Sequence, residues 1–526
     1  MKKVYFYLLC IFSIMPAATS AQLKALPLHG FYKEKFFQQS GERSIETFFP
    51  ANESQLDLHQ LIRDSFIQYY DFTDWLFKKH WIMISRPEGN LSISPLVDFT
   101  YGKETTDPER PALFRNTRGI YVEGQLMKRL AFNFVFAENQ SRFMGYESQY
   151  FDQRGELYVF GIDNYSLQNA VIPGGGRTKP FKTGAYDYAC SIGSIQYQMT
   201  KNIRIEAGNN QHFIGTGYRS LLLSDNSFPA PNVRLHWKIS PSWSYQVLIR
   251  NQKNLYRKPY TDAVEYPYES KFFGATYLTY KPLENLSVSL FTAGNQLRGD
   301  SLVKHRFEGQ MLIPVPLIQN DLLWGKSEVM NGISGLNVDF GMQKMRLYGQ
   351  LAIDKYNSTY LLAGQVGARF FDIFKVKNLS AQTEVNMVPR YFYAAANPKL
   401  SYSHYNLPSA HPKGNNFNEV LVHLNYEYKR AFITSRSVFY KTYGGDDSTQ
   451  IAANNIFSRS QVGAVFSSGS TFIQEFEVGY RFNRRYNGII SAGWKGRFFE
   501  FGDNRMTQQM FFIGLKTALF NQYLDF

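Results

Sequence analysis

The stretch LSISPLVDFTY, residues 91–101, decides the fold class of this chain. Its odd positions, from Leu91 to Tyr101, are apolar, and its even positions are polar with the exception of Leu96. Successive side chains of a β-strand point to opposite faces. The pattern therefore predicts a strand that has one apolar face and one polar face.

The same alternation recurs in residues 120–126, 420–428 and 472–482, with charged residues repeatedly on the second face. Aromatic residues gather near the ends of such segments, as in NRRYNGII, residues 483–490. Segments of about ten residues with this pattern are typical of transmembrane β-barrels, whose sheet closes on itself because lipid offers no partners for free backbone groups. A soluble β-sandwich also alternates and is the alternative.

The composition excludes several other classes of protein. The 526 residues include 45 Phe and 36 Tyr, which argues against intrinsic disorder. Two cysteines cannot build a disulfide scaffold. Beyond the N-terminus no apolar run is long enough for a transmembrane helix, and the mean hydropathy is −0.33. What remains is a large, aromatic-rich β protein.

Residues 1–21, MKKVYFYLLCIFSIMPAATSA, have the layout of a secretory signal peptide. Lys2 and Lys3 precede an apolar stretch, and small residues end at Ala21. We expect cleavage before Gln22, export, and a location in the outer membrane. Loss of the two lysines lowers the formal charge from +14 to +12. This charge indicates anionic partners such as lipid headgroups or acidic glycans, and no nucleic acid.

The remaining chain divides into two parts. Residues 22–89 form an N-terminal periplasmic segment, in which the apolar spacing over Ser54–Ile84 predicts a helix. Residues 90–526 form the barrel with inward-folded loops. At roughly 45–55 residues per hairpin, this length predicts about 16–20 strands.

No motif predicts catalysis, a metal or a cofactor. Gly174–Gly176 lacks the spacing of a phosphate loop. The nine histidines are scattered without the spacing of metal ligands. Ser220, His212 and Asp225 lie close in sequence, but Ser220 occupies no strand-to-helix elbow. We therefore expect a protein that is not an enzyme.

Binding chemistry is concentrated in the irregular stretch Gly208–Leu235. Its amides and charged groups stand beside aromatic rings, which suits a sugar ring or a sugar carboxylate. Equally, such loops can fold into the lumen, where their polar groups form hydrogen bonds with one another. The sequence leaves both interpretations open.

Four blocks carry a resemblance to a known family: Thr117–Phe143, Val171–Gln198, Gly208–Leu235 and Ser401–Glu419. The third, which contains GYRSLLLSD, is the most specific. Through these blocks the chain resembles the capsule assembly Wzi family, in the Bacteroidetes form that includes gliding-motility RemB-like proteins. The resemblance implies an outer-membrane barrel of about eighteen strands with a small periplasmic helical part.

The resemblance also implies a function. Members hold acidic capsular polysaccharide at the cell surface through an outward-facing lectin surface, without making or cutting it. The candidate ligand-binding residues within the matching blocks are His212, Tyr218, Arg219, Ser224, Asp225, His404, Asn406 and His411.

Three functions follow from these observations. The leading hypothesis is a non-enzymatic barrel that anchors capsular polysaccharide and supports capsule assembly. The alternatives are a gliding-motility-associated surface protein and a general porin. The expected partners are acidic capsular polysaccharide or another surface glycan, outer-membrane lipid and lipopolysaccharide, and a periplasmic protein.

Overall fold

The structure is a computed structural model of the whole chain. It describes residues 28–50, 76–77, 79–107, 109–127, 129–161, 164–257, 268–298, 305–312, 329–356, 359–395, 397–443, 468–517 and 521–526.

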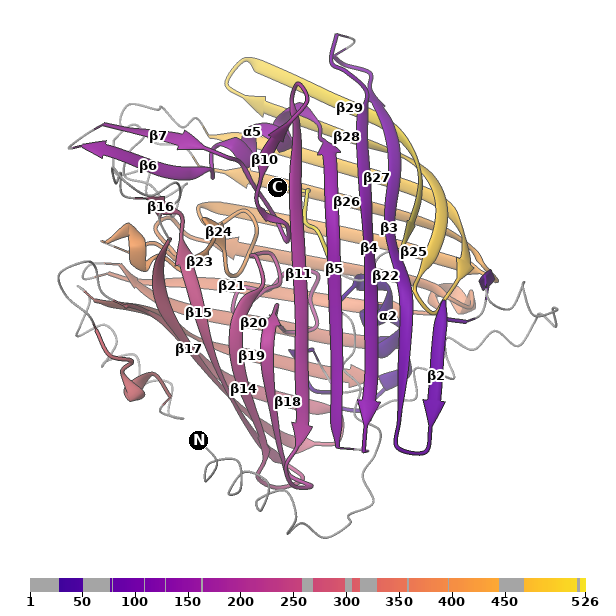
Figure 1. The fold of residues 1–526 in the computed structure, drawn as a ribbon, viewed down its shortest axis with the longest axis vertical. Helices are drawn as coiled ribbons and strands as arrows, with labels where there is room; N and C mark the ends of the chain where they lie inside the picture. The colour runs from indigo at the N-terminus through magenta and orange to yellow at the C-terminus, as the bar shows by residue number, and fades with distance from the viewer. Residues whose placement is uncertain are drawn as a thin grey trace, which may run out of the picture.

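Eighteen antiparallel strands among these residues close into a barrel (Figure 1), because the last strand, β29, pairs with the first, β3. The sequence prediction of a closed antiparallel barrel with 16–20 strands is confirmed. In order around the barrel the strands are β3 (Gly89–Glu104), β4 (Leu113–Leu126), β5 (Leu130–Arg142), β11 (Ala185–Gln198), β12 (Ile203–Asn210), β14 (Ala230–Lys238), β15 (Trp243–Asn254), β17 (Glu269–Leu283), β18 (Leu286–Leu297), β19 (Met330–Met342), β20 (Met345–Tyr356), β21 (Thr359–Phe371), β22 (Leu379–Val388), β25 (Phe417–Tyr428), β26 (Ala431–Thr442), β27 (Gly469–Asn483), β28 (Gly488–Phe501) and β29 (Asn504–Thr517).

The two ends of the barrel differ in the length of their connections. At one end the strands join through short turns, such as residues 127–129 between β4 and β5 and residues 284–285 between β17 and β18. At the other end residues 143–184 separate β5 from β11, and residues 389–416 separate β22 from β25. Outer-membrane barrels have short turns on the periplasmic side and long loops outside. We name the two ends the short-turn end and the long-loop end.

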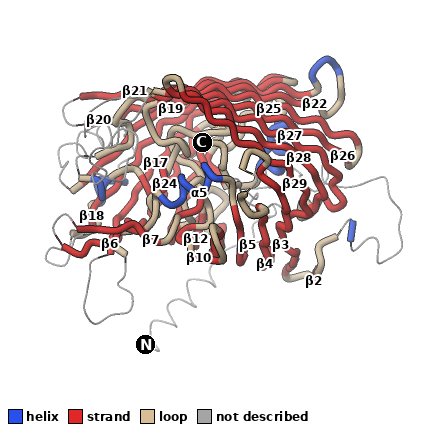
Figure 2. Tube along the Cα trace, turned by 90° about the horizontal axis from the view of Figure 1, so that it is seen from above, coloured by secondary structure: helices blue, strands red, loops and turns tan. Residues whose placement is uncertain are grey.

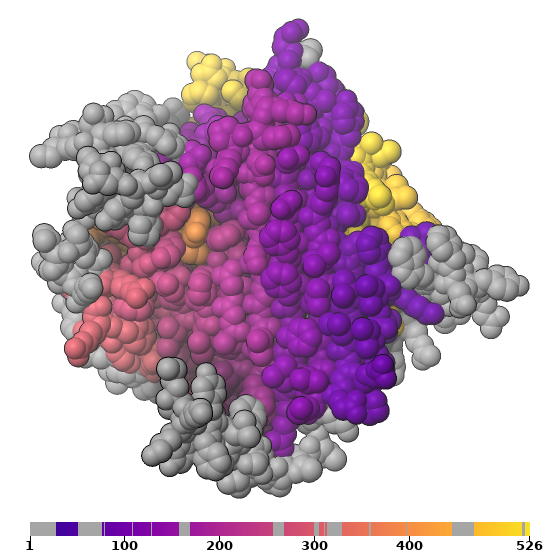
Figure 3. Space-filling model, in the orientation of Figure 1, coloured from indigo at the N-terminus to yellow at the C-terminus, as the bar shows by residue number. Residues whose placement is uncertain are grey.

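The outer face of the barrel is apolar, as the alternation predicted. Tyr101 is 60% exposed and Val366 is 71% exposed, while their strand neighbours point inward. Figure 3 shows the outside of β3–β5 and β11 as a continuous wall of side chains. Near the short-turn end Trp243 stacks on Tyr280 with ring centroids 4.4 Å apart, as expected for an aromatic girdle at a lipid–water interface.

Leu96, the exception to the alternation, points into the lumen and is 2% exposed. It belongs to an apolar cluster with Phe36 and Phe37 of the helix α2 (Gly30–Ser40). The helix begins after His29, whose Nδ1 accepts a hydrogen bond from Phe31 N, and it lies inside the barrel (Figure 1). A lumen-facing leucine is therefore stable because a helix covers it.

The helix predicted over Ser54–Ile84 falls largely outside the described residues. At its end the prediction was wrong, because Ile82–Arg86 form β2, which extends the barrel sheet by pairing with β3. Backbone hydrogen bonds to the edge of β3 decide this conformation, since the five side chains of β2 are exposed. In the part of the chain that the structure describes, no helix is long and apolar enough to cross a membrane.

Shorter helices and strands lie before the barrel strands and in the connections between them. The described residues also include the helix α5 (Gly145–Asp152) and the 3-10 turns η2 (Gly309–Leu312), η3 (Ile373–Lys375) and η4 (Pro398–Leu400). The remaining strands are β1 (Phe48–Phe49), β6 (Glu156–Gly161), β7 (Asn164–Gln168), β8 (Val171–Ile172), β9 (Gly176–Arg177), β10 (Lys179–Phe181), β13 (Phe213–Ile214), β16 (Tyr256–Arg257), β23 (Ser403–His404) and β24 (Leu407–Pro408).

Candidate functional site

Inward-folded segments fill the lumen of the barrel (Figure 2), and the chain's last described residues lie among them. They are α2, the β12–β14 connection (residues 211–229), the described part of the β22–β25 connection (residues 389–395 and 397–416) and the segment 521–526. We call these four segments the plug.

Three consecutive leucines, Leu221–Leu223, form the apolar centre of the plug. All three are fully buried and belong to one cluster with wall residues that include Phe273, Ile333 and Leu421. Gly335 on β19 provides the room, because a Cβ there would come within 2.3 Å of Leu222 Cδ2. Burial of each leucine contributes about 1.5–3 kcal/mol. The most specific block of the sequence is therefore a packing element.

Polar side chains satisfy the irregular backbone of this leucine run. Gln350 Oε1 accepts a hydrogen bond from Leu221 N at 2.7 Å. The hydroxyl of Tyr393 donates to Leu221 O at 2.7 Å, and that of Tyr402 donates to Leu222 O at 2.8 Å. Unpaired backbone groups in a dry interior are costly. Side chains of the barrel wall and of the β22–β25 connection thus supply the hydrogen bonds that water normally gives to a loop.

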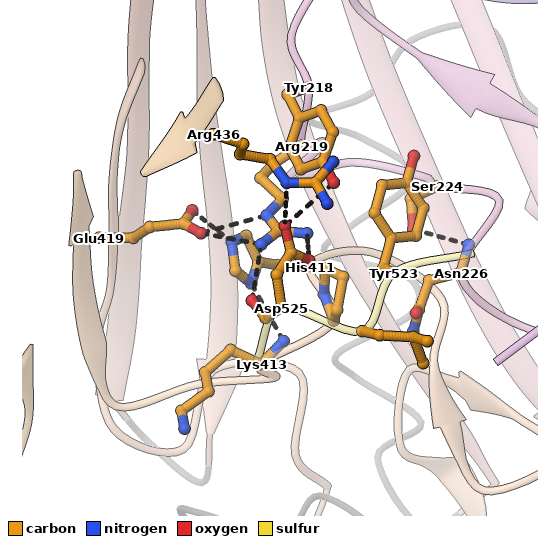
Figure 4. Close-up of polar contacts among 12 residues, drawn as sticks. Tyr218, Arg219, Ser224, Asn226, His411, Lys413, Glu419, Arg436, Tyr523 and Asp525 are labelled. Carbon is orange, nitrogen blue, oxygen red and sulfur yellow. Dashed lines mark hydrogen bonds and ion pairs between the residues drawn. The ribbon is translucent and has the colours of Figure 1, made fainter. Parts of the chain in front are cut away.

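Arg219 joins three parts of the molecule (Figure 4). Its Nη1 donates to Asp525 Oδ1 at 3.0 Å, and its Nε donates to Glu419 Oε1 on β25 at 3.1 Å. Its Nη2 donates to the hydroxyl of Tyr440 on β26 at 2.8 Å. The Arg219, Glu419 and Asp525 side chains are essentially inaccessible to solvent. In such surroundings this ionic cluster fixes the plug connection, the wall and the segment 521–526 relative to one another.

Two further carboxylate contacts fix the same connection. Glu384 on β22 accepts hydrogen bonds from the backbone N–H groups of Tyr218 and Arg219 at 2.8 and 3.1 Å. Asp525 Oδ2 accepts a hydrogen bond from the Tyr218 hydroxyl at 3.0 Å and lies 3.3 Å from Nε of Arg436. Tyr218 and Arg219 are thus held through both backbone and side chain.

The two histidines of the β22–β25 connection, His404 and His411, act as neutral hydrogen-bonding groups. His411 Nε2 donates to Glu419 Oε2 at 2.8 Å, and its Nδ1 accepts from Lys413 N at 3.1 Å. Burial lowers the pKa of His411, and the opposing effect of the Glu419 carboxylate is smaller. His404 Nδ1 accepts from Lys253 N at 2.9 Å, and burial lowers the pKa of this imidazole as well.

The other candidate residues also have partners within the protein. Asp225 accepts hydrogen bonds from the Tyr523 hydroxyl at 2.8 Å and from Asn521 Nδ2 at 2.9 Å. The Ser224 hydroxyl donates to Ala410 O. Asn406 Nδ2 donates to Gly155 O at 3.0 Å.

His212 is fully buried, with Nε2 at 3.4 Å from Glu206 Oε1 and its ring edge-on to Phe48. Ser220, which stood near His212 and Asp225 in sequence, contacts Gln350 instead.

The structure therefore brings the eight candidate residues into contacts that hold the plug together. Tyr218, Arg219 and His411 share one network through Asp525 and Glu419. Asp225 and Ser224 contact the neighbouring residues Tyr523 and Ala410, whereas His212, His404 and Asn406 make contacts apart from this network. The partners that sequence reasoning missed are Glu384, Glu419, Tyr440, Gln350 and Asp525. The first four occupy lumen-facing positions of strands, so alternation alone could have indicated that they point inward.

The comparisons with known proteins concern the fold. The chain matches no family model and no curated protein. It shares its fold with Wzi. That Escherichia coli protein, described as an outer membrane protein involved in group 1 capsule assembly and as a carbohydrate-binding β-barrel, is 11% identical, and the match covers 95% of this chain and 100% of that chain with a TM-score of 0.53. The outer membrane protein OprD of Pseudomonas aeruginosa is 12% identical over 82% of this chain and 95% of that chain, with a TM-score of 0.42.

A group of basic and aromatic residues lies at the long-loop end, where β20 ends and β22 leads into the plug. The rings of Tyr356 and Tyr391 stack with centroids 4.6 Å apart and planes inclined by 7°. The guanidinium of Arg390 lies 4.8 Å from the Tyr391 ring. Tyr391 has a φ of 66°, a left-handed conformation that non-glycine residues rarely adopt. We call Tyr356, Arg390 and Tyr391 the rim group.

The rim group has the chemistry to hold a sugar acid. Stacked aromatic rings offer an apolar face to the C–H face of a pyranose. A guanidinium binds a carboxylate through two parallel hydrogen bonds. Left-handed backbone at a bulky residue is costly and clusters at binding sites, where the surrounding structure enforces it. All three rim side chains are partly exposed.

Proposed function

We propose that the protein is a non-enzymatic outer-membrane barrel that binds acidic surface polysaccharide at its long-loop end and supports capsule assembly by anchoring that polysaccharide. The observation that carries the proposal is the rim group, in which Arg390 stands beside the stacked rings of Tyr356 and Tyr391. An acidic sugar needs both an apolar plate and a cation. Neither a porin nor a purely structural barrel needs that pair at its rim.

The location follows from the barrel's outer surface. Its apolar band is suited to lipid, and at the long-loop end Tyr360 is 61% exposed, with Lys355 Nζ 5.4 Å from its ring. Tyrosine and lysine at this level suit lipid and lipopolysaccharide headgroups. The signal-like N-terminus and the positive charge of the chain also support a location in the outer membrane.

The plug favours this function over that of a general porin. The buried cluster of Arg219, Glu419 and Asp525 and the packed leucines Leu221–Leu223 cross the middle of the lumen. A wide solute pore needs an open lumen. A barrel with a fixed plug instead offers a rigid platform for loops that bind a ligand outside.

Binding of a polyuronate by the purified full-length protein in detergent tests the proposal. We expect Arg390→Met to weaken binding at least tenfold, because a hydrogen-bonded charge pair is worth about 1.5–3 kcal/mol. The matched control is Arg505→Met, which removes a positive charge from an exposed pair with Glu500 at the same end and leaves the rim group intact. A neutral glucan of equal length should bind weakly to all three proteins.

Equal polyuronate affinity of Arg390→Met, Arg505→Met and the unaltered protein would overturn the assignment of the rim group. An experiment in cells distinguishes capsule anchoring from a gliding-associated role. Deletion of the gene should release capsule from the surface, whereas retained capsule with lost surface spreading would favour that alternative.

A further inference from the structure

A cavity of about 370 Å³ lies in the lumen, between the plug and the inner wall formed by β21, β22, β25–β29, β3–β5 and β11. Arg481 and Asn487, which border the β27–β28 turn, line it, as does Lys35 of α2. The cavity therefore extends from the short-turn end into the barrel. Its lining is rich in charged side chains of both signs.

A second cavity, of about 130 Å³, continues toward the long-loop end, where Leu113 and Phe143 line it. Five residues line both cavities: Arg115, Arg436, Glu475, Lys516 and Gln522. The two spaces therefore adjoin on one side of the plug. Together they follow the barrel wall through much of its height.

The charges on this side of the lumen are paired but partly exposed. Lys516 Nζ lies 2.7 Å from Glu477 Oε1, and Arg115 Nη1 lies 3.7 Å from Asp98 Oδ2. The Arg115 side chain is 32% exposed, whereas the Arg219 side chain on the packed side of the plug is 0% exposed. A wall with both signs and accessible charges suits small hydrated ions, with weak preference between cations and anions.

The segment 521–526 forms the inner boundary of both cavities. Gln522 and Tyr523 line the first, and Gln522 and Leu524 line the second. Its outer end closes the space, because Leu524 and Phe526 join an apolar cluster with Leu113 and Phe143 of the long-loop end. Phe526 also stacks on Tyr150 of α5 with ring centroids 3.6 Å apart.

The contacts that hold this segment are mostly polar, and they include the hydrogen bonds of Asn521 and Tyr523 to Asp225 and that of the Tyr146 hydroxyl to Leu524 O. Asp525 is bound by Arg219, Arg436 and Tyr218, as described above. Lys495 Nζ donates to Leu524 O at 2.9 Å. The packed leucines Leu221–Leu223 belong to a different apolar cluster from Leu524 and Phe526. Loss of the polar contacts would therefore release the segment while the centre of the plug stays packed.

We propose that the segment 521–526 is a gate over a passage for small inorganic ions along the inner wall of β26–β29, β3 and β4. While Asp525 is bound to Arg219 and Arg436, Leu524 and Phe526 close the passage near the long-loop end. Release of the segment joins the two cavities and opens them to that end. The inference is independent of glycan binding at the rim.

Conductance of the protein in planar bilayers bathed in potassium chloride tests the gate. The full-length protein should give few or no stable steps, and the chain lacking residues 521–526 should show at least ten times as many open events. In that shortened chain Thr117→Trp, which fills the first cavity from β4, should reduce the conductance. Ile120→Trp, on the outward face of the same strand, is the matched control and should leave the conductance unchanged.

Asp525→Lys tests the gate without shortening the chain, because it places a third cation beside Arg219 and Arg436. We expect it to conduct, while Asp525→Asn, which keeps the hydrogen-bond acceptor, should stay largely closed. Folding of each variant is checked by heat-modifiable migration in gels. If the shortened chain does not fold, the conductance of Asp525→Lys tests the gate alone. A folded but silent variant of either kind, or steady conductance of the full-length protein equal to that of the variants, would overturn the proposal.

Discussion

Arg219 illustrates at the scale of a single residue what the sequence could and could not predict. The family resemblance made Arg219 a candidate ligand-binding residue, and the structure places it at a junction of three segments of the protein. Its partner Asp525 lies 306 residues further along the chain. No periodicity links the two, because Asp525 lies beyond the last strand. Pairings of this kind depend on how the whole chain closes, so local patterns cannot reveal them.

Removal of the Arg219 guanidinium should therefore be strongly destabilising. Arg219→Met leaves the buried carboxylate of Glu419 without its cation and leaves Asp525 paired with Arg436 alone. Breaking a buried ion pair in this way costs about 3–5 kcal/mol. The measurement is urea unfolding of the refolded protein in detergent. Arg505→Met is the control, because the pair of Arg505 with Glu500 is exposed and exposed pairs contribute about 0–1 kcal/mol.

The triple variant Arg219→Met, Glu419→Gln, Asp525→Asn should regain part of the lost stability, since it leaves no buried charge uncompensated. A single Arg219→Met variant that unfolds at the same urea concentration as Arg505→Met would refute the ionic account of the plug.

At the scale of single elements, two-residue alternation predicted the strands well and the plug poorly. Val420, Val422 and Leu424 are exposed on the outer face of β25, as the pattern requires. The run Leu221–Leu223 has no alternation, and neither a strand nor an amphipathic helix accounts for three adjacent apolar residues. Their burial depends on the surrounding wall of the barrel. Leu96 breaks its strand pattern for the same reason, because a plug helix covers it.

Leu222→Ala should show that the leucine run is a core and not a mobile loop. Truncation of a fully buried leucine costs about 2–5 kcal/mol, depending on how far the surroundings collapse. Leu351→Ala is the matched control, since Leu351 lies on the outer face of β20 and is 40% exposed. We expect the control to lose less than half as much free energy of unfolding. Equal losses for the two variants would contradict a packed plug.

At the scale of the whole molecule, composition and alternation predicted a closed barrel with charged residues inside, and they could not decide what fills it. Whether loops enter the lumen depends on the diameter of the ring and on contacts between distant segments. The lumen has a packed side around Leu221–Leu223 and a side with accessible charges around Arg115 and Lys516. Anchoring of a ligand outside and a gated ion passage inside are compatible because they use different regions of the same barrel.

Stability of the whole molecule should fall as the solution is acidified, because three histidines that lie outside the barrel strands, His212, His404 and His411, are buried and His29 is half-buried. Burial lowers the pKa of His29 to about 3 and that of His212 to about 4, and it also lowers the pKa values of His404 and His411. In the unfolded chain each histidine titrates near its ordinary pKa of about 6.5. Between that pH and the folded-state values the unfolded chain binds more protons, so the free energy of unfolding decreases as the pH falls below about 6.5.

Each histidine that is neutral in the folded protein and protonated in the unfolded chain contributes about 1.4 kcal/mol per pH unit. Urea unfolding in detergent at pH 7.5, 6 and 5 measures the decrease, and His404→Asn should reduce its slope by about the share of one histidine. Folded protein whose unfolding free energy is constant from pH 7.5 to 5 would show that these imidazoles gain compensating contacts when protonated. The closed state of the plug would then not depend on neutral histidines.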